Sequence, residues 1–203
     1  MRYPAAETAH KHERILDKAS RLFRERGFGG VSVGEIMKAT GLTHGPFYNH
    51  FESKEALMRE SFEHRGNESL AALDRDCTTP EGMSAYVDYY LSARHRDAPG
   101  DGCLMPALAA EAARVQGVRP SFAQFVDATV QRFARYVPWQ SKRTARGDSI
   151  RMLASMVGAV VLARAVADEA LSDEILEEAR RGLMPDIGLS SSDSPTTTGK
   201  GRK

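Results

Sequence analysis

The sequence predicts an all-α protein, and three observations lead to this prediction. Apolar residues recur at helical spacing along nearly the whole chain, and no two alternating segments are joined by a tight turn. Helix-start signals precede these stripes, as where Ser32 is followed by Glu35 and Thr79 by Pro80. The 203 residues, 41% hydrophobic and 27% charged, are enough to bury a core. We expect about nine helices, in a small N-terminal three-helix unit and a larger C-terminal helical unit.

Each of the first four predicted helices begins or ends at a recognisable residue. Gly27 and Gly41 end the first two, because glycine readily adopts the left-handed backbone that closes a helix. Ser32 and Ser53 supply N-caps for the second and the fourth. These helices are expected at residues 7–26, 32–40, 43–50 and 54–76.

The rest of the chain is predicted to form further helices separated by polar connectors. Residues 96–102 are expected to be a loop because they contain Asp, Pro and Gly. Residues 188–203 are rich in Ser, Thr, Gly and Lys and are expected to be a flexible tail. The helices are expected from residue 80, at 103–114, around 122–137, and at 148–168 and 172–183.

Charge and composition restrict the class of protein. Residues 1–54 carry nine Lys and Arg against six Asp and Glu, whereas the remainder carries 19 against 21. A basic N-terminal part suits a local phosphate contact. The longest apolar run, 152–163, is shorter than the roughly 20 residues that a membrane helix needs. The sequence starts with no apolar leader, and its two cysteines form no disulfide framework, so we expect a cytoplasmic protein without a membrane segment.

Residues 32–51 fit a helix-turn-helix, a pair of helices in which the second presents a polar face. Gly41 supplies the turn, and Phe47 and Phe51 are predicted to face inward. Small and hydrogen-bonding side chains on the outer face of the second helix could approach base edges in a major groove. By spacing alone this pattern also occurs as ordinary helix packing. The predicted outer face consists of His44, Gly45, Tyr48 and Asn49.

The wording of this segment is more specific than its spacing. The stretch SVGEIMKATGLTHGPFYNHFESKEAL, residues 32–57, resembles the signature of the TetR family, and ILDKASRLFRERGFGGVSV before it resembles the family's first helix. The resemblance covers about residues 9–69, and GCLMPALAAEAAR at 102–114 is similar to a segment of one subgroup. It implies a DNA-binding domain at 1–53, a regulatory and dimerisation domain at 54–187 and a tail at 188–203. The implied function is transcriptional regulation, with repression the usual behaviour of the family.

The resemblance also implies roles for individual residues. Phosphate contacts would come from Thr43, Tyr48, His50 and Lys54, and contacts with base edges from His44, Gly45 and Asn49. Pro46 departs from the family pattern, because a small or hydroxylic residue often stands there. The alternative is structural: Tyr48 packs, His50 caps and Lys54 is solvated.

A homodimer is expected from both the resemblance and the pattern. The segment from Ile150 to Ala167 is apolar on several sides, and such a helix must be covered on several sides. Paired recognition helices would reach major grooves about 34–36 Å apart, which requires a palindromic or near-palindromic operator. The alternative is a central helix buried within a monomer. The predicted interface consists of Leu153, Val157, Val160, Val161, Ile175, Leu176, Ala179 and Leu183.

An effector, apolar or aromatic, is expected to bind in the C-terminal part. The alternative is that its aromatic and methionine residues are plain core. Cys103 at a predicted helix start suggests a sensor of oxidants or electrophiles, although Asp101 nearby disfavours a thiolate and a buried packing role is the alternative. The predicted pocket residues are Tyr86, Tyr90, Met105, Phe122, Phe125 and Met152.

Other classes of function have less support in the sequence. No metal-ligand spacing, nucleophile elbow or phosphate-binding glycine loop is present, so we predict no enzyme, no metal and no cofactor. An adaptor that has lost DNA binding is disfavoured by the intact motif. A sequence-independent DNA binder is disfavoured by the net charge of +1. The expected partners are operator DNA, a second copy of the chain and an unidentified small molecule.

Overall fold

The computed structural model describes residues 5–42 and 45–187, and in this part it contains nine α-helices and no strand. The predicted all-α fold is confirmed. The predicted tail at 188–203 lies outside the described residues. The elements are α1 (Ala5–Arg26), α2 (Val33–Ala39), η1 (Gly45–Asn49), α3 (Lys54–Asp76), α4 (Pro80–Tyr90), α5 (Ala93–Asp97), η2 (Pro99–Asp101), α6 (Leu104–Ala112), α7 (Arg119–Tyr136), α8 (Ala145–Ala165), α9 (Glu169–Leu183) and η3 (Met184–Ile187).

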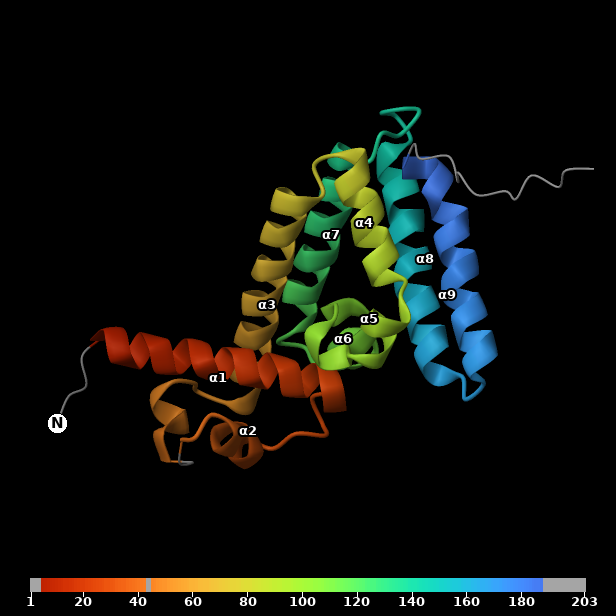
Figure 1. The fold of residues 1–203 in the computed structure, drawn as a ribbon. Helices are drawn as coiled ribbons and strands as arrows, with labels where there is room; N and C mark the ends of the chain where they lie inside the picture. Colours follow the sequence, from red (N-terminus) through yellow and green to blue (C-terminus); the bar gives the residue numbers. More distant parts are fainter. Residues whose placement is uncertain (1–4, 43–44, 188–203) are drawn as a thin grey trace, which may run out of the picture.

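The helices form two parts, which we call the head (α1, α2 and η1) and the body (α4 to α9 with η2 and η3). Figure 1 shows α1 lying across the lower end of the body, with α2 and η1 beneath it. The long helix α3 rises from the head and packs along α7, while α8 and α9 lie side by side at the far edge. The head contacts the body where α1 packs on α6 and η2, and α1 also packs on α3, which connects the two parts.

Capping contacts set the ends of α2. The Ser32 hydroxyl accepts a hydrogen bond from the Glu35 N–H, and the Glu35 carboxylate accepts one from the Ser32 N–H at 2.8 Å. Gly41 adopts φ +73°, and the N–H groups of Gly41 and Leu42 donate back to Lys38 and Met37. These two hydrogen bonds close the helix, with a glycine in the left-handed region. The predicted capping box and glycine turn are therefore confirmed.

A small aromatic core holds the head together. Phe47 and Phe51 are buried with their rings 5.6 Å apart, and Phe23 meets Phe28 edge-on at 5.2 Å. The inner residues of α2, Ile36 and Met37, are completely buried beside them. The inward orientation predicted for the two phenylalanines of the second helix is confirmed.

The structure differs from the sequence prediction in several elements, and α7 and α8 each start about three residues before their predicted positions. The predicted α-helix at 43–50 is a 3-10 helix, η1, in which the His50 N–H bonds to the Phe47 carbonyl. Residues 93–97 and 99–101 are helical rather than a loop, because the Ser92 hydroxyl caps the His95 N–H and Pro99 opens η2. The last helix starts three residues early, since Asp168 accepts from the N–H groups of Ala170 and Leu171.

No helix among the described residues combines the length and the apolar character that crossing a membrane requires.

The capping box should make the stability of the head depend on pH. Arg26 donates to the Glu35 carboxylate at 2.5 Å, and this contact together with the bonds from Ser32 lowers the pKa of Glu35 from 4.5 to about 2. A carboxylate with a depressed pKa stabilises the fold above its unfolded pKa, and that contribution is lost as pH falls toward the folded value. We expect Glu35→Gln to lower the melting temperature at pH 7, with a deficit that shrinks from pH 4.5 downward, as followed by circular dichroism.

The control for this prediction is Glu13→Gln, which removes the same charge from an exposed position on α1. Parallel pH profiles for the two variants would show that the capping box makes no special contribution.

Candidate nucleic-acid interface and regulatory cavity

The outer face of η1 is the candidate DNA-binding surface. Tyr48 is 68% exposed and Asn49 is also exposed. Phe47, on the inner side of the same turn, is completely buried. Gly45 lies at the start of η1, and Thr43 and His44 lie outside the described residues. The structure therefore brings Tyr48 and Asn49 onto one solvent-facing turn, as the sequence predicts.

His50 and Lys54 flank this turn, and both make contacts within the protein. Burial, followed by the charges of His12 and Lys11, lowers the pKa of His50, so its ring is neutral near pH 7. The Lys54 ammonium donates to the Phe28 carbonyl at 2.7 Å and so ties the start of α3 to the chain leaving α1. A phosphate contact by either residue stays a prediction. His50 would take part as a neutral hydrogen-bonding group.

A buried arginine joins the head to the body. Arg24 on α1 is only 8% exposed, and its guanidinium donates to the Gly100 carbonyl in η2 and to the Ser20 hydroxyl. Burial, and next the nearby charge of Arg65, lowers the pKa of Arg24 from 12.5 to about 10, so it stays protonated at neutral pH. Sequence analysis missed this residue. The signal was present, because Arg24 lies on the buried face of α1, one turn after Ser20.

A second contact crosses the same junction. The Glu111 carboxylate at the end of α6 accepts from the Phe28 N–H at 2.6 Å and from the Gly29 N–H at 3.3 Å. Gly27 just before them has φ +76°, and its own N–H donates to the Phe23 carbonyl. A β-carbon at Gly27 would collide with the Glu111 carboxylate. Glycine is thus required here both by the backbone conformation and by the close approach of α6.

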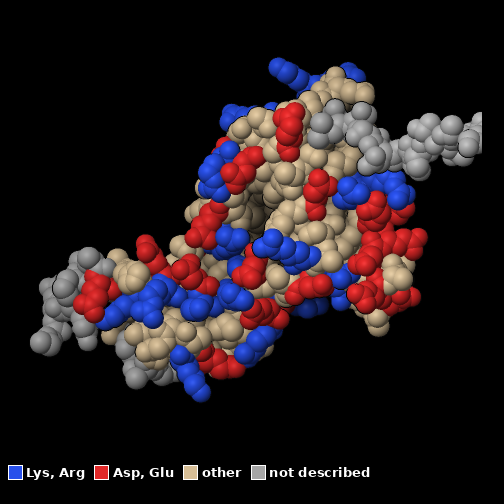
Figure 2. Space-filling model, viewed as in Figure 1, with Lys and Arg blue, Asp and Glu red and all other residues tan. Residues whose placement is uncertain are grey.

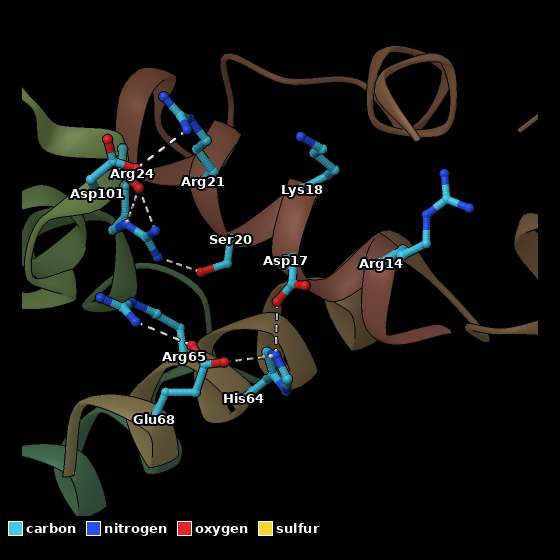
Figure 3. Close-up of a pocket in the computed structure, with 11 residues that line it drawn as sticks. Arg14, Asp17, Lys18, Ser20, Arg21, Arg24, His64, Arg65, Glu68 and Asp101 are labelled. Atoms are coloured by element: carbon cyan, nitrogen blue, oxygen red, sulfur yellow. Dashed lines mark hydrogen bonds and ion pairs between the residues drawn. The ribbon is translucent and has the colours of Figure 1, made fainter. Parts of the chain in front are cut away.

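A polar cleft of about 370 Å³ lies between α1 and α3 beside this junction. Figure 3 shows charged side chains converging on it from α1, α3 and the segment around Asp101. His64 meets Asp17 at 2.9 Å and Glu68 at 3.5 Å, and Arg21 meets Asp101 at 3.3 Å. The cleft also contains several cationic side chains, namely Arg14, Lys18, Arg21, Arg24 and Arg65.

One atom each of Asp17, His64 and Glu68 lies within 4.8 Å of the others, a spacing that could hold a metal ion. Both carboxylates already have partners, since Glu68 also accepts from Arg65 at 3.1 Å. The cationic side chains in the same cleft oppose a further positive charge. We therefore assign no metal to this group.

The body contains a cavity of about 260 Å³ enclosed mainly by α3, α4 and α7. Figure 2 shows the surface hollowed between α3 and α4, with acidic and basic side chains around the opening. Four of the predicted pocket residues line the cavity, and Cys103 lies beside them. The other two do not line this cavity: Met152 is 1% exposed in the core, and Phe122, which packs on Phe62, lines a separate apolar groove of about 520 Å³ formed by α6, α7 and α8. The four lining residues are Tyr86, Tyr90, Met105 and Phe125.

Several further residues line the cavity and were not predicted, among them Arg65, His95 and Thr129. His95 is 1% exposed, its Nδ1 lies 2.7 Å from the Tyr90 carbonyl, and its Nε2 accepts from the Cys103 N–H at 3.0 Å. Nδ1 must therefore carry the proton, and burial lowers the pKa of His95, which keeps the ring neutral. No sequence pattern marks these residues, because α3, α5 and α7 bring them together from distant positions.

Cys103 is half-buried at the N-cap of α6. Burial raises the pKa of its thiol, although the Met105 backbone and the neighbouring Tyr90 hydroxyl act in the opposite direction. The thiol is therefore protonated at neutral pH, which lowers its reactivity. A sensing role for Cys103 stays a prediction.

The outer surfaces of α8 and α9 carry exposed apolar side chains. Of the eight predicted interface residues, Val157, Val161, Ile175 and Ala179 reach this surface. The other four predictions were wrong, because Leu153, Val160, Leu176 and Leu183 are buried in the core of their own subunit. A helix that is apolar all round does not reveal from its sequence which side faces the core. Exposed residues missed by the prediction are Ile150, Leu162 and Leu171.

Comparison with known proteins agrees with this architecture. Residues 15–61 match the sequence model of the bacterial regulatory proteins of the tetR family. The N-terminal part of this chain is thus similar to the tetR family, and the described chain shares the fold of solved TetR-family regulators. The HTH-type transcriptional regulator AcrR of Shigella flexneri is 44% identical over 57 residues, which cover 28% of this chain and 26% of AcrR. The HTH-type transcriptional repressor DhaR of Mycobacterium sp. (strain GP1) is 25% identical over 185 residues, 85% of this chain and 92% of DhaR.

Solved TetR-family structures share the fold. The reduced form of NemR from E. coli superposes with a TM-score of 0.73 at 20% identity, covering 86% of this chain and 95% of NemR. A TetR-family regulator from Cytophaga hutchinsonii gives 0.73 at 22% identity, covering 94% and 100% of the two chains. The match to AcrR spans about a quarter of that protein, and the residues that match the family model, 15–61, lie in the head and the start of α3.

The Glu111 contact with the N–H groups that follow Gly27 should make this glycine more important for stability than Gly41. Alanine at Gly27 or at Gly41 forces a β-carbon into the left-handed region, which costs about 1 kcal/mol or more. At Gly27 the Glu111 carboxylate must also move, which leaves the Phe28 and Gly29 N–H groups without their acceptor, a further loss of about 1 kcal/mol or more. We expect Gly27→Ala to lower the free energy of unfolding in urea more than Gly41→Ala does.

Gly41→Ala is the matched control, because a β-carbon there meets no atom within 4 Å. Equal losses for the two variants would contradict a role for the Glu111 contact.

Proposed function

We propose that this chain is a sequence-specific DNA-binding transcriptional regulator, of the repressor type, that acts as a homodimer on a palindromic or near-palindromic operator. The observation that carries the proposal is the match of residues 15–61 to the TetR family, together with the exposed Tyr48 and Asn49 on the turn it covers. AcrR and DhaR are named as a regulator and a repressor, which supports the same function here. Such a protein acts in the cytoplasm, without catalysis.

In this proposal the chain divides as the resemblance implies. Residues 1–53 bind DNA, residues 54–187 dimerise and receive the signal, and residues 188–203 form a tail. The base edges are contacted by His44, Gly45 and Asn49, and the phosphates by Thr43, Tyr48, His50 and Lys54. Because the Lys54 ammonium already bonds to the Phe28 carbonyl, it would reach a phosphate with its remaining donors.

Replacing Asn49 should weaken specific binding selectively. The Asn49 amide is exposed on η1, where it can offer a donor and an acceptor to one base. We expect Asn49→Ala to lower the affinity for DNA upstream of the protein's own gene about tenfold, with little change for a scrambled duplex. Fluorescence anisotropy at two salt concentrations measures both.

Asn67→Ala serves as the control, since Asn67 is equally exposed but lies on α3 away from η1. Equal losses on both duplexes, or an equal loss for the control, would count against readout of bases by Asn49.

The dimer is proposed to form through the exposed apolar side chains of α8 and α9. Leu162 is 57% exposed on α8, and Leu171, 44% exposed, begins the neighbouring stripe on α9. Val161, Ile175 and Ala179 extend the same outer surface. Exposure of this apolar surface to water is unfavourable, and a second copy of the chain would cover it.

A charge placed in this surface should separate the subunits. We expect Leu162→Glu to shift sedimentation velocity from dimer to monomer at micromolar concentration, because the carboxylate would be buried without a partner. Operator affinity should fall with it, since one head reads only half of a palindrome. Ala71→Glu, at an exposed position on α3, is the control. A monomeric wild-type protein that still binds the operator tightly would contradict the dimer.

The signal is proposed to be a small apolar or aromatic molecule that binds in the body cavity and releases the protein from DNA. Tyr86, Tyr90, Met105 and Phe125 provide apolar walls for such a molecule. A reactive electrophile that modifies Cys103 is the alternative signal, because this thiol lines the same cavity. Its raised pKa makes the non-covalent signal the better supported of the two.

A further inference from the structure

The body cavity contains two buried hydrogen-bond donors that lack an acceptor. These are the hydroxyl of Tyr90 and the Nε–H of Arg65, and both residues line the cavity. Tyr90 is only 2% exposed, so bulk solvent does not satisfy its hydroxyl. Among residues 5–42 and 45–187, these are the two buried side-chain nitrogen or oxygen atoms without a hydrogen-bond partner. Both donors without an acceptor therefore belong to residues of the same cavity wall.

Neighbouring groups do not supply the missing acceptors. Both ring nitrogens of His95 are engaged, with the Tyr90 carbonyl and with the Cys103 N–H. The Thr129 hydroxyl donates to the Phe125 carbonyl. The Cys103 thiol lies close enough to Tyr90 to affect its pKa, but sulfur is a weak acceptor. Because a buried donor without a partner is costly and rare in proteins, a bound ligand is the natural source of the acceptor.

The charges around the cavity favour an anion as that acceptor. Arg65 and the buried Arg24 lie close together, and their repulsion contributes to the lowered pKa of Arg24. Glu68 takes one Nη of Arg65, but its Nε stays unpaired. The carboxylates that also line the cavity, Asp76 and Asp101, are already paired with Arg75 and Arg21. Of the charged groups named here, Arg65 alone keeps a buried donor without an acceptor, and this group is a cation.

We propose that the cavity binds a small aromatic or apolar acid whose carboxylate accepts hydrogen bonds from Arg65 Nε–H and Tyr90 O–H. The apolar part of the acid packs against Tyr86, Met105 and Phe125. This inference rests on the proposed regulatory function and names the chemical class of its effector. Neutral hydrocarbons of the same shape pack against the apolar walls but leave the Arg65 Nε–H without an acceptor.

The position of Arg65 gives the acid a route to the head. Arg65 and Asp101 line the body cavity, and they also line the polar cleft between α1 and α3 that Figure 3 shows. An anion at Arg65 neutralises charge next to Arg24, the residue that docks α1 on η2. Binding of the acid therefore changes the balance of charge at the contact that holds the head.

The test uses three probes of similar shape and different charge on the full chain: 2-naphthoate, 2-methylnaphthalene and 2-naphthylmethylammonium. We expect titration calorimetry to show naphthoate binding at least about tenfold tighter than the neutral probe, and the cation binding most weakly. Tyr90→Phe should lower the affinity for naphthoate about tenfold, because it removes one bond to a carboxylate. It should not lower the melting temperature of the unliganded protein, since the hydroxyl has no partner to lose.

Tyr89→Phe is the matched control, because it removes a hydroxyl from a tyrosine on the same cavity wall that is 44% exposed. Equal binding of the three probes, a preference for the cation, failure of naphthoate to bind, or full affinity in Tyr90→Phe would each overturn the proposal. Operator binding by the same preparation distinguishes a wrong effector class from a wrong regulatory function. If the operator is bound, only the effector class is wrong; if it is not, the proposed regulatory function fails as well.

Discussion

The relation between head and body depends on the burial of one charged group, the guanidinium of Arg24. A cation removed from water must have its donors satisfied, and here they reach the Gly100 carbonyl and the Ser20 hydroxyl. Gly100 favours this close approach, because a β-carbon there would displace the Glu25 side chain of α1. The contact fixes the C-terminal end of α1 against the body. Everything that α1 carries, including α2 and η1, is thus positioned relative to η2.

Local features of this fold could be predicted from the sequence because they depend on residues three or four positions apart. Ser32 and Glu35 cap each other across one turn, Gly41 closes the same helix, and Thr79 with Pro80 opens α4. Features that depend on packing could not be predicted in this way. The sides of α8 look alike in sequence, so Val160 was assigned to the surface although it is completely buried. Likewise, the Asp, Pro and Gly of residues 96–102 suggested a loop, but Ser92 caps one short helix there and Pro99 opens another.

The candidate site divides in the same manner. Tyr48 and Asn49 were predictable because their exposure follows from the spacing of Phe47 and Phe51 on one short segment. The cavity was only half predictable, because tyrosines at helical spacing look the same whether they line a cavity or fill a core. Arg65, His95 and Thr129 reach the cavity from three helices, and Met152 misses it by facing the core. Such membership is a property of helix packing and is absent from any local pattern.

A ligand shifts a conformational equilibrium only as far as its affinity differs between the two states. The elements around the cavity therefore matter according to whether they also contact the head. Helices α4 and α7 bound the cavity without strong contact to α1, whereas α3 and η2 pack directly on it. Arg65 belongs to α3 and Asp101 to η2, and both also line the polar cleft between α1 and α3. An effector that bonds to Arg65 acts on the head contact itself, while one held only by the tyrosines of α4 must first move α3 or η2.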